Sequence, residues 1–106
     1  MDDEKRKEYR CNTKTEVTVG DVKGTICNLS MGGMMCFLPE PVPTMQELTV
    51  KFDIDGFSME IIGNALRCEE ITKDNFSTGI YFKSPSVTEE QRNKLALYLD
   101  KLRRKA

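Results

Sequence analysis

One segment, residues 47–69, restricts the possible folds of this chain more than any other. In residues 47–54 apolar and polar side chains alternate, so the apolar ones share one face of a strand. An Asp-Gly dipeptide follows at 55–56 and is typical of a two-residue hairpin turn. Residues 57–69 predict a return strand that is long enough to need a bend, and Gly63 is the expected position of that bend. The segment therefore predicts a long antiparallel hairpin.

Shorter strand-like segments flank this hairpin on both sides. Most of them end at a turn signal or at a proline, which cannot donate a hydrogen bond to a neighbouring strand. They cover residues 15–19, 24–29, 34–38 and 76–83. The chain has 106 residues, which is the size of one domain. Strands of this length joined by hairpin turns predict an antiparallel barrel or sandwich.

Near the C-terminus the apolar periodicity changes to that of a helix. Thr88 and Gln91 have the spacing of a capping box, in which each side chain satisfies a backbone N–H at the helix start. Leu95, Leu99 and Leu102 fall on one helical face. We expect these leucines to be buried over one opening of the β-structure; a helix that binds a partner protein is the alternative. The resulting division of the chain is a flexible leader at 1–14, a β-barrel at 15–85 and a C-terminal helix at 86–106.

Composition excludes several classes of function. The chain has no histidine, which removes histidine-based triads and histidine-ligated zinc. No pair of acidic residues has catalytic spacing, so we expect neither an enzyme nor a bound cofactor. The net charge is −1, with basic residues near both ends and an acidic middle, which argues against binding of duplex nucleic acid. No apolar run approaches the roughly 20 residues of a membrane span, and the charged N-terminus does not resemble a secretion signal.

The four cysteines, Cys11, Cys27, Cys36 and Cys68, contain no C-x-x-C pair. Cys27 and Cys36 lie in apolar, strand-like runs, where a free cysteine behaves as a small apolar residue. We therefore expect buried free thiols rather than a disulfide or a metal site. A reducing, cytoplasmic location agrees best with that expectation.

Two short motifs gather residues suited to binding an anionic nucleotide. The first motif is Arg6 and Arg10, which have three residues between them. Their planar guanidinium groups can bind phosphate or a guanine edge through two hydrogen bonds at once. Asn28, Ser30 and Gly33 form an N-x-S-x-x-G pattern at a turn, where amide and hydroxyl groups can hydrogen-bond a base. Taken singly, the motifs also fit a solvated leader and a capped turn. The nearby methionines are expected to fill the core: Met31, Met34 and Met35.

In this order, and followed by a β-rich body and a C-terminal helix, the two motifs resemble those of the PilZ domain family. The resemblance covers residues 5–102 and extends to the sequences GNALR at 63–67 and GIYF at 79–82. It implies a six-stranded antiparallel β-barrel with a C-terminal α-helix. It also implies binding of the bacterial second messenger cyclic di-GMP, often as a stacked dimer.

The resemblance also implies ligand-binding roles for individual residues. The expected binding residues are Arg6, Arg10, Asn28, Ser30 and Gly33, with Lys5, Gly32 and Arg67 as further candidates. Lys5 stands where family members often have another arginine, and its ammonium group lacks the planar fork. Arg67 extends from a predicted strand and could reach the ligand or pair with Glu69.

The leading functional hypothesis is a non-enzymatic bacterial receptor for cyclic di-GMP. Ligand binding would order the leader against the barrel, and a partner protein in motility, polysaccharide production or regulation would recognise the new surface. One alternative is a PilZ-fold interaction module that binds no nucleotide. Another is a small barrel that binds single-stranded nucleic acid, which the low aromatic content of 8% and the acidic body disfavour.

Overall fold

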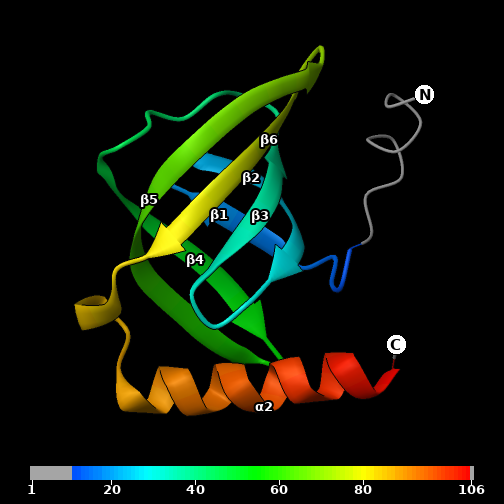
Figure 1. Ribbon diagram of the computed structural model, residues 1–106, viewed down its shortest axis with the longest axis vertical. Coiled ribbons are helices and arrows are strands. Elements are labelled where there is room, and N and C mark those ends of the chain that lie inside the picture. The colour runs from blue at the N-terminus through cyan, green and yellow to red at the C-terminus, as the bar shows by residue number, and fades with distance from the viewer. Residues whose placement is uncertain (1–10, 106) are drawn as a thin grey trace.

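Six antiparallel strands close into a barrel in the computed structural model, which describes residues 11–105 (Figure 1). The strands are β1 (Glu16–Val19), β2 (Val22–Leu29), β3 (Gly33–Leu38), β4 (Glu47–Ile54), β5 (Phe57–Thr72) and β6 (Asn75–Phe82). Their order around the barrel is β1-β2-β3-β6-β5-β4, and pairing of β1 with β4 closes it. The expected six-stranded antiparallel barrel is confirmed.

The hairpin of β4 and β5 has the expected turn. Asp55 and Gly56 both have positive φ, 50° and 83°, as a two-residue turn that matches the strand twist requires. On β4 the alternating side chains Val50, Phe52 and Ile54 point into the barrel and are almost fully buried. These side chains belong to one continuous core inside the barrel.

β5 is irregular at a different place from the one predicted. Its pairing with β6 shifts register twice, between Ala65 and Arg67 and between Glu70 and Thr72, so bulges lie at Leu66 and at Ile71 and none lies at Gly63. Gly63 pairs regularly with both neighbouring strands. Its lack of a side chain leaves room for Ile80, because a Cβ at Gly63 would lie 2.9 Å from Ile80 Cγ2. The first bulge leaves the Leu66 side chain 56% exposed on the outer wall.

A short 3₁₀ turn, η1 (Ser84–Ser86), leads into α2 (Glu89–Lys105), which lies across one end of the barrel (Figure 1). The capping box is confirmed, since the Thr88 N–H donates to Gln91 Oε1 at 2.9 Å and the Gln91 N–H donates to Thr88 Oγ1 at 3.1 Å. Leu95 is fully buried, whereas Leu99 and Leu102 are only half-buried. Within residues 11–105 no helix combines the length and apolar character needed to cross a membrane.

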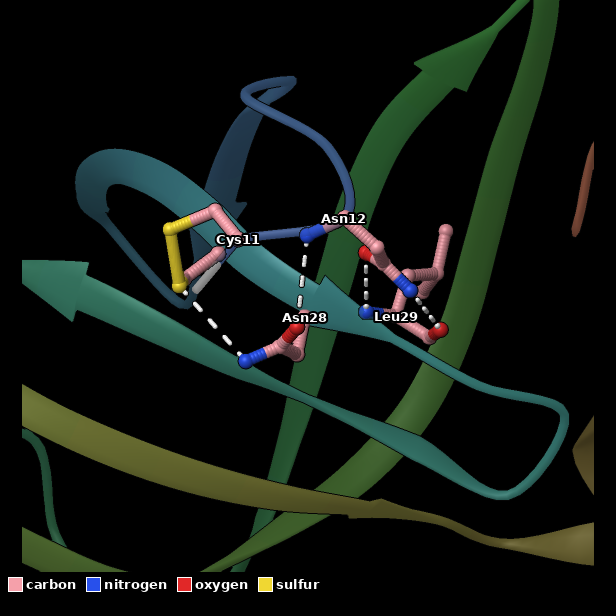
Figure 2. The surroundings of a disulfide bond; sticks show 5 residues. Cys11, Asn12, Asn28 and Leu29 are labelled. Atoms are coloured by element: carbon pink, nitrogen blue, oxygen red, sulfur yellow. Dashed lines mark hydrogen bonds between the residues drawn. A yellow bond between two sulfur atoms is a disulfide. The ribbon is translucent and has the colours of Figure 1, made fainter. Parts of the chain in front are cut away.

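The expectation of four free thiols is wrong for one pair. Cys11 and Cys27 form a disulfide, with their Cα atoms 4.4 Å apart (Figure 2). The pairing arises because the chain at Cys11 and Asn12 runs beside the end of β2, a contact that cysteine spacing does not reveal. Cys36, which is fully buried, and Cys68, which is half-buried, are free as expected.

We expect Cys36 to resist thiol reagents that modify Cys68. Burial, and to a lesser degree the neighbouring Cys68, raises the pKa of the Cys36 thiol from 9.0 to about 12. Because the folded chain retains this proton where the unfolded chain loses it, the contribution of Cys36 to stability falls as the pH rises from about 9 to about 12. Peptide mass spectrometry after iodoacetamide treatment at pH 8 should find Cys68 labelled and Cys36 unlabelled. Equal labelling rates would contradict the burial.

Candidate functional site

A row of four residues crosses the outer wall of the barrel. Asn28 on β2 pairs with Met35 on β3, Met35 pairs with Gly79 on β6, and Gly79 pairs with Arg67 on β5. Paired residues point to the same side of a sheet, and adjacent strands lie about 4.8 Å apart, so the row spans about 14 Å. The register thus brings the second motif and Arg67 to one surface, although they are far apart in the sequence.

A cleft of about 710 Å³ lies over this row. Its lining is largely apolar, with a few polar groups and no carboxylate among the described residues; it comprises Asn28, Leu29, Ser30, Gly32, Gly33, Met34, Met35, Leu66, Arg67, Gly79, Ile80 and Tyr81. A Cβ built on Gly79 would meet nothing within 4 Å, so the centre of the cleft is open. An apolar cleft of this size with a few converging polar groups is the usual form of a small-molecule site.

The turn after β2 shapes one edge of the cleft. The backbone N–H of Ser30 donates to Gly33 O at 2.9 Å, and the Ser30 hydroxyl donates to the same oxygen at 3.1 Å. The Phe82 N–H donates to Gly32 O at 2.9 Å and ties the turn to the end of β6. Ser30 therefore holds the turn while its hydroxyl oxygen keeps lone pairs for a ligand.

Gly33 has a packing role that the motif alone does not show. A Cβ at this position would lie 2.1 Å from the backbone oxygen of Ile80 and 3.3 Å from Tyr81 Cα. Those are backbone atoms of β6, which cannot turn away as a side chain can. Gly33 thus allows β3 and β6 to pair under the cleft, whereas Gly32 has open space around it.

Asn12 fixes the end of the leader beside the motif (Figure 2). Its Oδ1 accepts from the Leu29 N–H at 3.1 Å, and its Nδ2 donates to Leu29 O at 3.0 Å. Its backbone N–H donates to Cys27 O at 2.9 Å and approaches Asn28 Oδ1 at 3.3 Å. The described part of the leader is therefore attached to β2 next to Asn28.

The structure brings together five of the sequence-predicted site residues. Asn28, Ser30, Gly32, Gly33 and Arg67 all line the cleft. Among the described residues Arg67 has no ion pair, and in particular none with Glu69, so its guanidinium group is available at the cleft wall. The remaining three, Lys5, Arg6 and Arg10, lie outside the described residues.

Sequence reasoning missed the walls of the cleft. Tyr81, opposite Gly33 on β6, is 52% exposed, and Leu66 reaches the surface through the bulge. Met35, expected in the core, faces the cleft instead because it alternates along β3 with the buried Met34 and Cys36. Tyr81 could have been found from the alternation of residues 79–82, which already puts it on the outer face.

Fold and cleft together define a class: a small closed barrel whose outer wall, next to a motif-bearing turn, forms a binding surface. The chain belongs to the PilZ domain family, whose model matches residues 4–101. PilZ domains as a family are receptors for cyclic di-GMP and are known as binding and adaptor modules rather than as enzymes. Comparison with curated proteins gave no significant match, and neither did comparison with solved structures.

Proposed function

We propose that this protein is a cyclic di-GMP receptor that uses the cleft over β2, β3, β6 and β5. The observation that supports this most strongly is the convergence of Asn28, Ser30, Gly33 and Arg67 on that cleft. The attachment of Cys11 and Asn12 beside the cleft adds support, because Arg10 directly precedes Cys11 in the sequence. Arg6 lies four positions before Arg10.

The chemistry of the cleft suits a guanine dinucleotide. Arg67 can offer its planar fork to a phosphate or to the O6/N7 edge of guanine. Asn28 has an amide oxygen and nitrogen that each keep bonding capacity beyond the contacts made here, and can pair with a base edge. The open backbone at Gly32 and Gly79 lets a flat base approach, and the exposed ring of Tyr81 offers a stacking surface.

In this proposal the arginines of the leader close over the ligand, and a partner protein recognises the result. The hydroxyl of Tyr98 on α2 hydrogen-bonds to Thr13 at 2.8 Å and to Thr15 at 3.1 Å. A change in the leader would therefore reach α2, whose Leu97 is 65% exposed. A bacterial cytoplasmic partner in motility, polysaccharide production or regulation is the proposed recipient of the signal.

Calorimetric titration with three nucleotides tests the proposal: cyclic di-GMP, linear pGpG and GTP. Cyclic di-GMP should bind at least about tenfold more tightly than either of the others, because its ring is already ordered before binding. Titration of lysozyme with the same ligand controls for heats of dilution. Absence of cyclic di-GMP binding, or equal binding of all three nucleotides, would reject the proposal.

Replacing Tyr81 with alanine should weaken cyclic di-GMP binding by about five- to hundredfold, the range for losing one base–aromatic stacking contact. Tyr81→Phe keeps the ring and is the matched control, with affinity expected to stay near wild type. The position is 52% exposed, so both variants should fold normally. Equal affinity of Tyr81→Ala and wild type in calorimetry would place the ligand away from this wall.

A further inference from the structure

The Cys11–Cys27 disulfide joins the two motifs of the candidate site. Cys11 directly follows Arg10, the second arginine of the leader motif, and Cys27 directly precedes Asn28, the first residue of the turn motif. The bond crosses 16 positions of sequence and attaches the end of the leader to β2 (Figure 2). No other covalent link holds the leader at the cleft among the described residues.

The remaining attachment of this segment is made of hydrogen bonds by Asn12 and Thr13, which are exposed or partly buried. Asn12 is exposed, and its bonds to Leu29 and to Cys27 O lie around the disulfide. Net contributions of such bonds are small because water competes for the same groups. We therefore expect the segment at Cys11 and Asn12 to detach from β2 much more often once the disulfide is cleaved.

The two sulfur atoms are placed for cleavage from outside. Cys11 is exposed, whereas Cys27 is 1% exposed, so a reducing thiolate meets Cys11 Sγ first. Asn28 Nδ2 lies 3.6 Å from Cys27 Sγ as a donor and can stabilise the thiolate that leaves. This contact also links the state of the disulfide to a side chain of the cleft.

We propose that the Cys11–Cys27 pair is a redox-sensitive clamp that sets the affinity of the site for cyclic di-GMP; this inference rests on the proposed function. A dithiol reductant gives two electrons and two protons to the disulfide, forming two cysteine thiols, and itself becomes a disulfide. A disulfide oxidant such as glutathione disulfide reverses this, taking two electrons and two protons and leaving as two thiols. The closed clamp holds Cys11, the residue after the arginine motif, against β2, and the open clamp releases Cys11.

The closed clamp should bind cyclic di-GMP about tenfold more tightly than the open one. Ordering the backbone of one residue costs a free energy equal to about a factor of ten, and the disulfide removes about that much ordering from the binding step. In this proposal the clamp acts by holding Cys11, the residue that follows Arg10 in the sequence, and Cys11 has no direct role in ligand contact.

The experiment compares oxidised and TCEP-reduced wild type by calorimetry with cyclic di-GMP. Thiol titration of the denatured protein verifies each state, with two free thiols expected when oxidised and four when reduced. Cys11→Ser should bind like the reduced wild type and should not respond to TCEP. Cys68→Ser, a matched replacement outside the clamp, should keep the full redox response.

Amide hydrogen exchange gives a second readout that needs no ligand. The Asn12 and Thr13 N–H groups both donate to Cys27 O, at 2.9 and 3.3 Å. On reduction their exchange should accelerate at least about tenfold, whereas the core amide of Val50 should not change, which separates opening of the clamp from general unfolding.

Tight binding of equal strength in both redox states would overturn the clamp while leaving the receptor intact. Absence of binding in both states would overturn the proposed function, and unchanged exchange at Asn12 would overturn the clamp by itself.

Discussion

Replacing Gly33 with alanine is expected to lower the free energy of unfolding by about 3 kcal/mol or more, at the upper end of the range for overpacked sites. The reason is geometric, because the new Cβ would lie 2.1 Å from the backbone oxygen of Ile80. β3 would have to move away from β6, and the ladder hydrogen bonds under the cleft would lengthen or break. Urea denaturation followed by far-UV circular dichroism measures the change.

Gly32→Ala is the matched control for that experiment. A Cβ at Gly32 meets nothing within 4 Å, so stability should change by less than about 0.5 kcal/mol, as for other surface substitutions. Equal stability of Gly33→Ala and Gly32→Ala would show that the close pairing of β3 and β6 at the cleft does not exist in solution.

Replacing Arg10 with alanine is expected to weaken cyclic di-GMP binding by about ten- to hundredfold. Loss of one bidentate contact to guanine costs about 1–3 kcal/mol, and loss of a phosphate contact adds a dependence on salt. The affinity of Arg10→Lys should lie between those of wild type and Arg10→Ala, because lysine keeps the charge and loses the planar fork. Calorimetry at two salt concentrations separates the two contributions.

Arg92→Ala is the control for Arg10→Ala. Arg92 is exposed in the first turns of α2 and does not line the cleft, so its removal changes the net charge equally without touching the proposed site. Affinities of Arg10→Ala and Arg92→Ala that both match wild type would exclude Arg10 from ligand binding.

Local patterns predicted those parts of the fold that depend on neighbouring residues. The alternation in residues 47–54 and the Asp-Gly turn identified β4 and its hairpin, because a strand with one buried face must alternate. Thr88 and Gln91 identified the start of α2 for the same reason: a capping box is closed within four residues.

Features that depend on register across the barrel were not predictable from local patterns. The bulge at Leu66 and the shift at Cys27 are consequences of how β5 aligns with β6 and β2 with β3. They expose Leu66 at the cleft and set Asn28 opposite Met35. The disulfide has the same origin, because Cys11 meets Cys27 only when the leader lies along β2. A motif indicates which residues bind, whereas register determines which neighbours surround them.

The central claim is that cyclic di-GMP lies in the cleft on the outer wall of the barrel. Two-dimensional ¹H–¹⁵N NMR during titration tests it most directly, because each backbone amide reports separately. We predict the largest shifts at the amides of Gly32, Gly33, Arg67 and Gly79, with small shifts at Thr18 and Lys51 on the opposite side of the barrel, where β1 pairs with β4. Shifts confined to α2 or to the β1–β4 side, or no shifts at saturating ligand, would contradict the account.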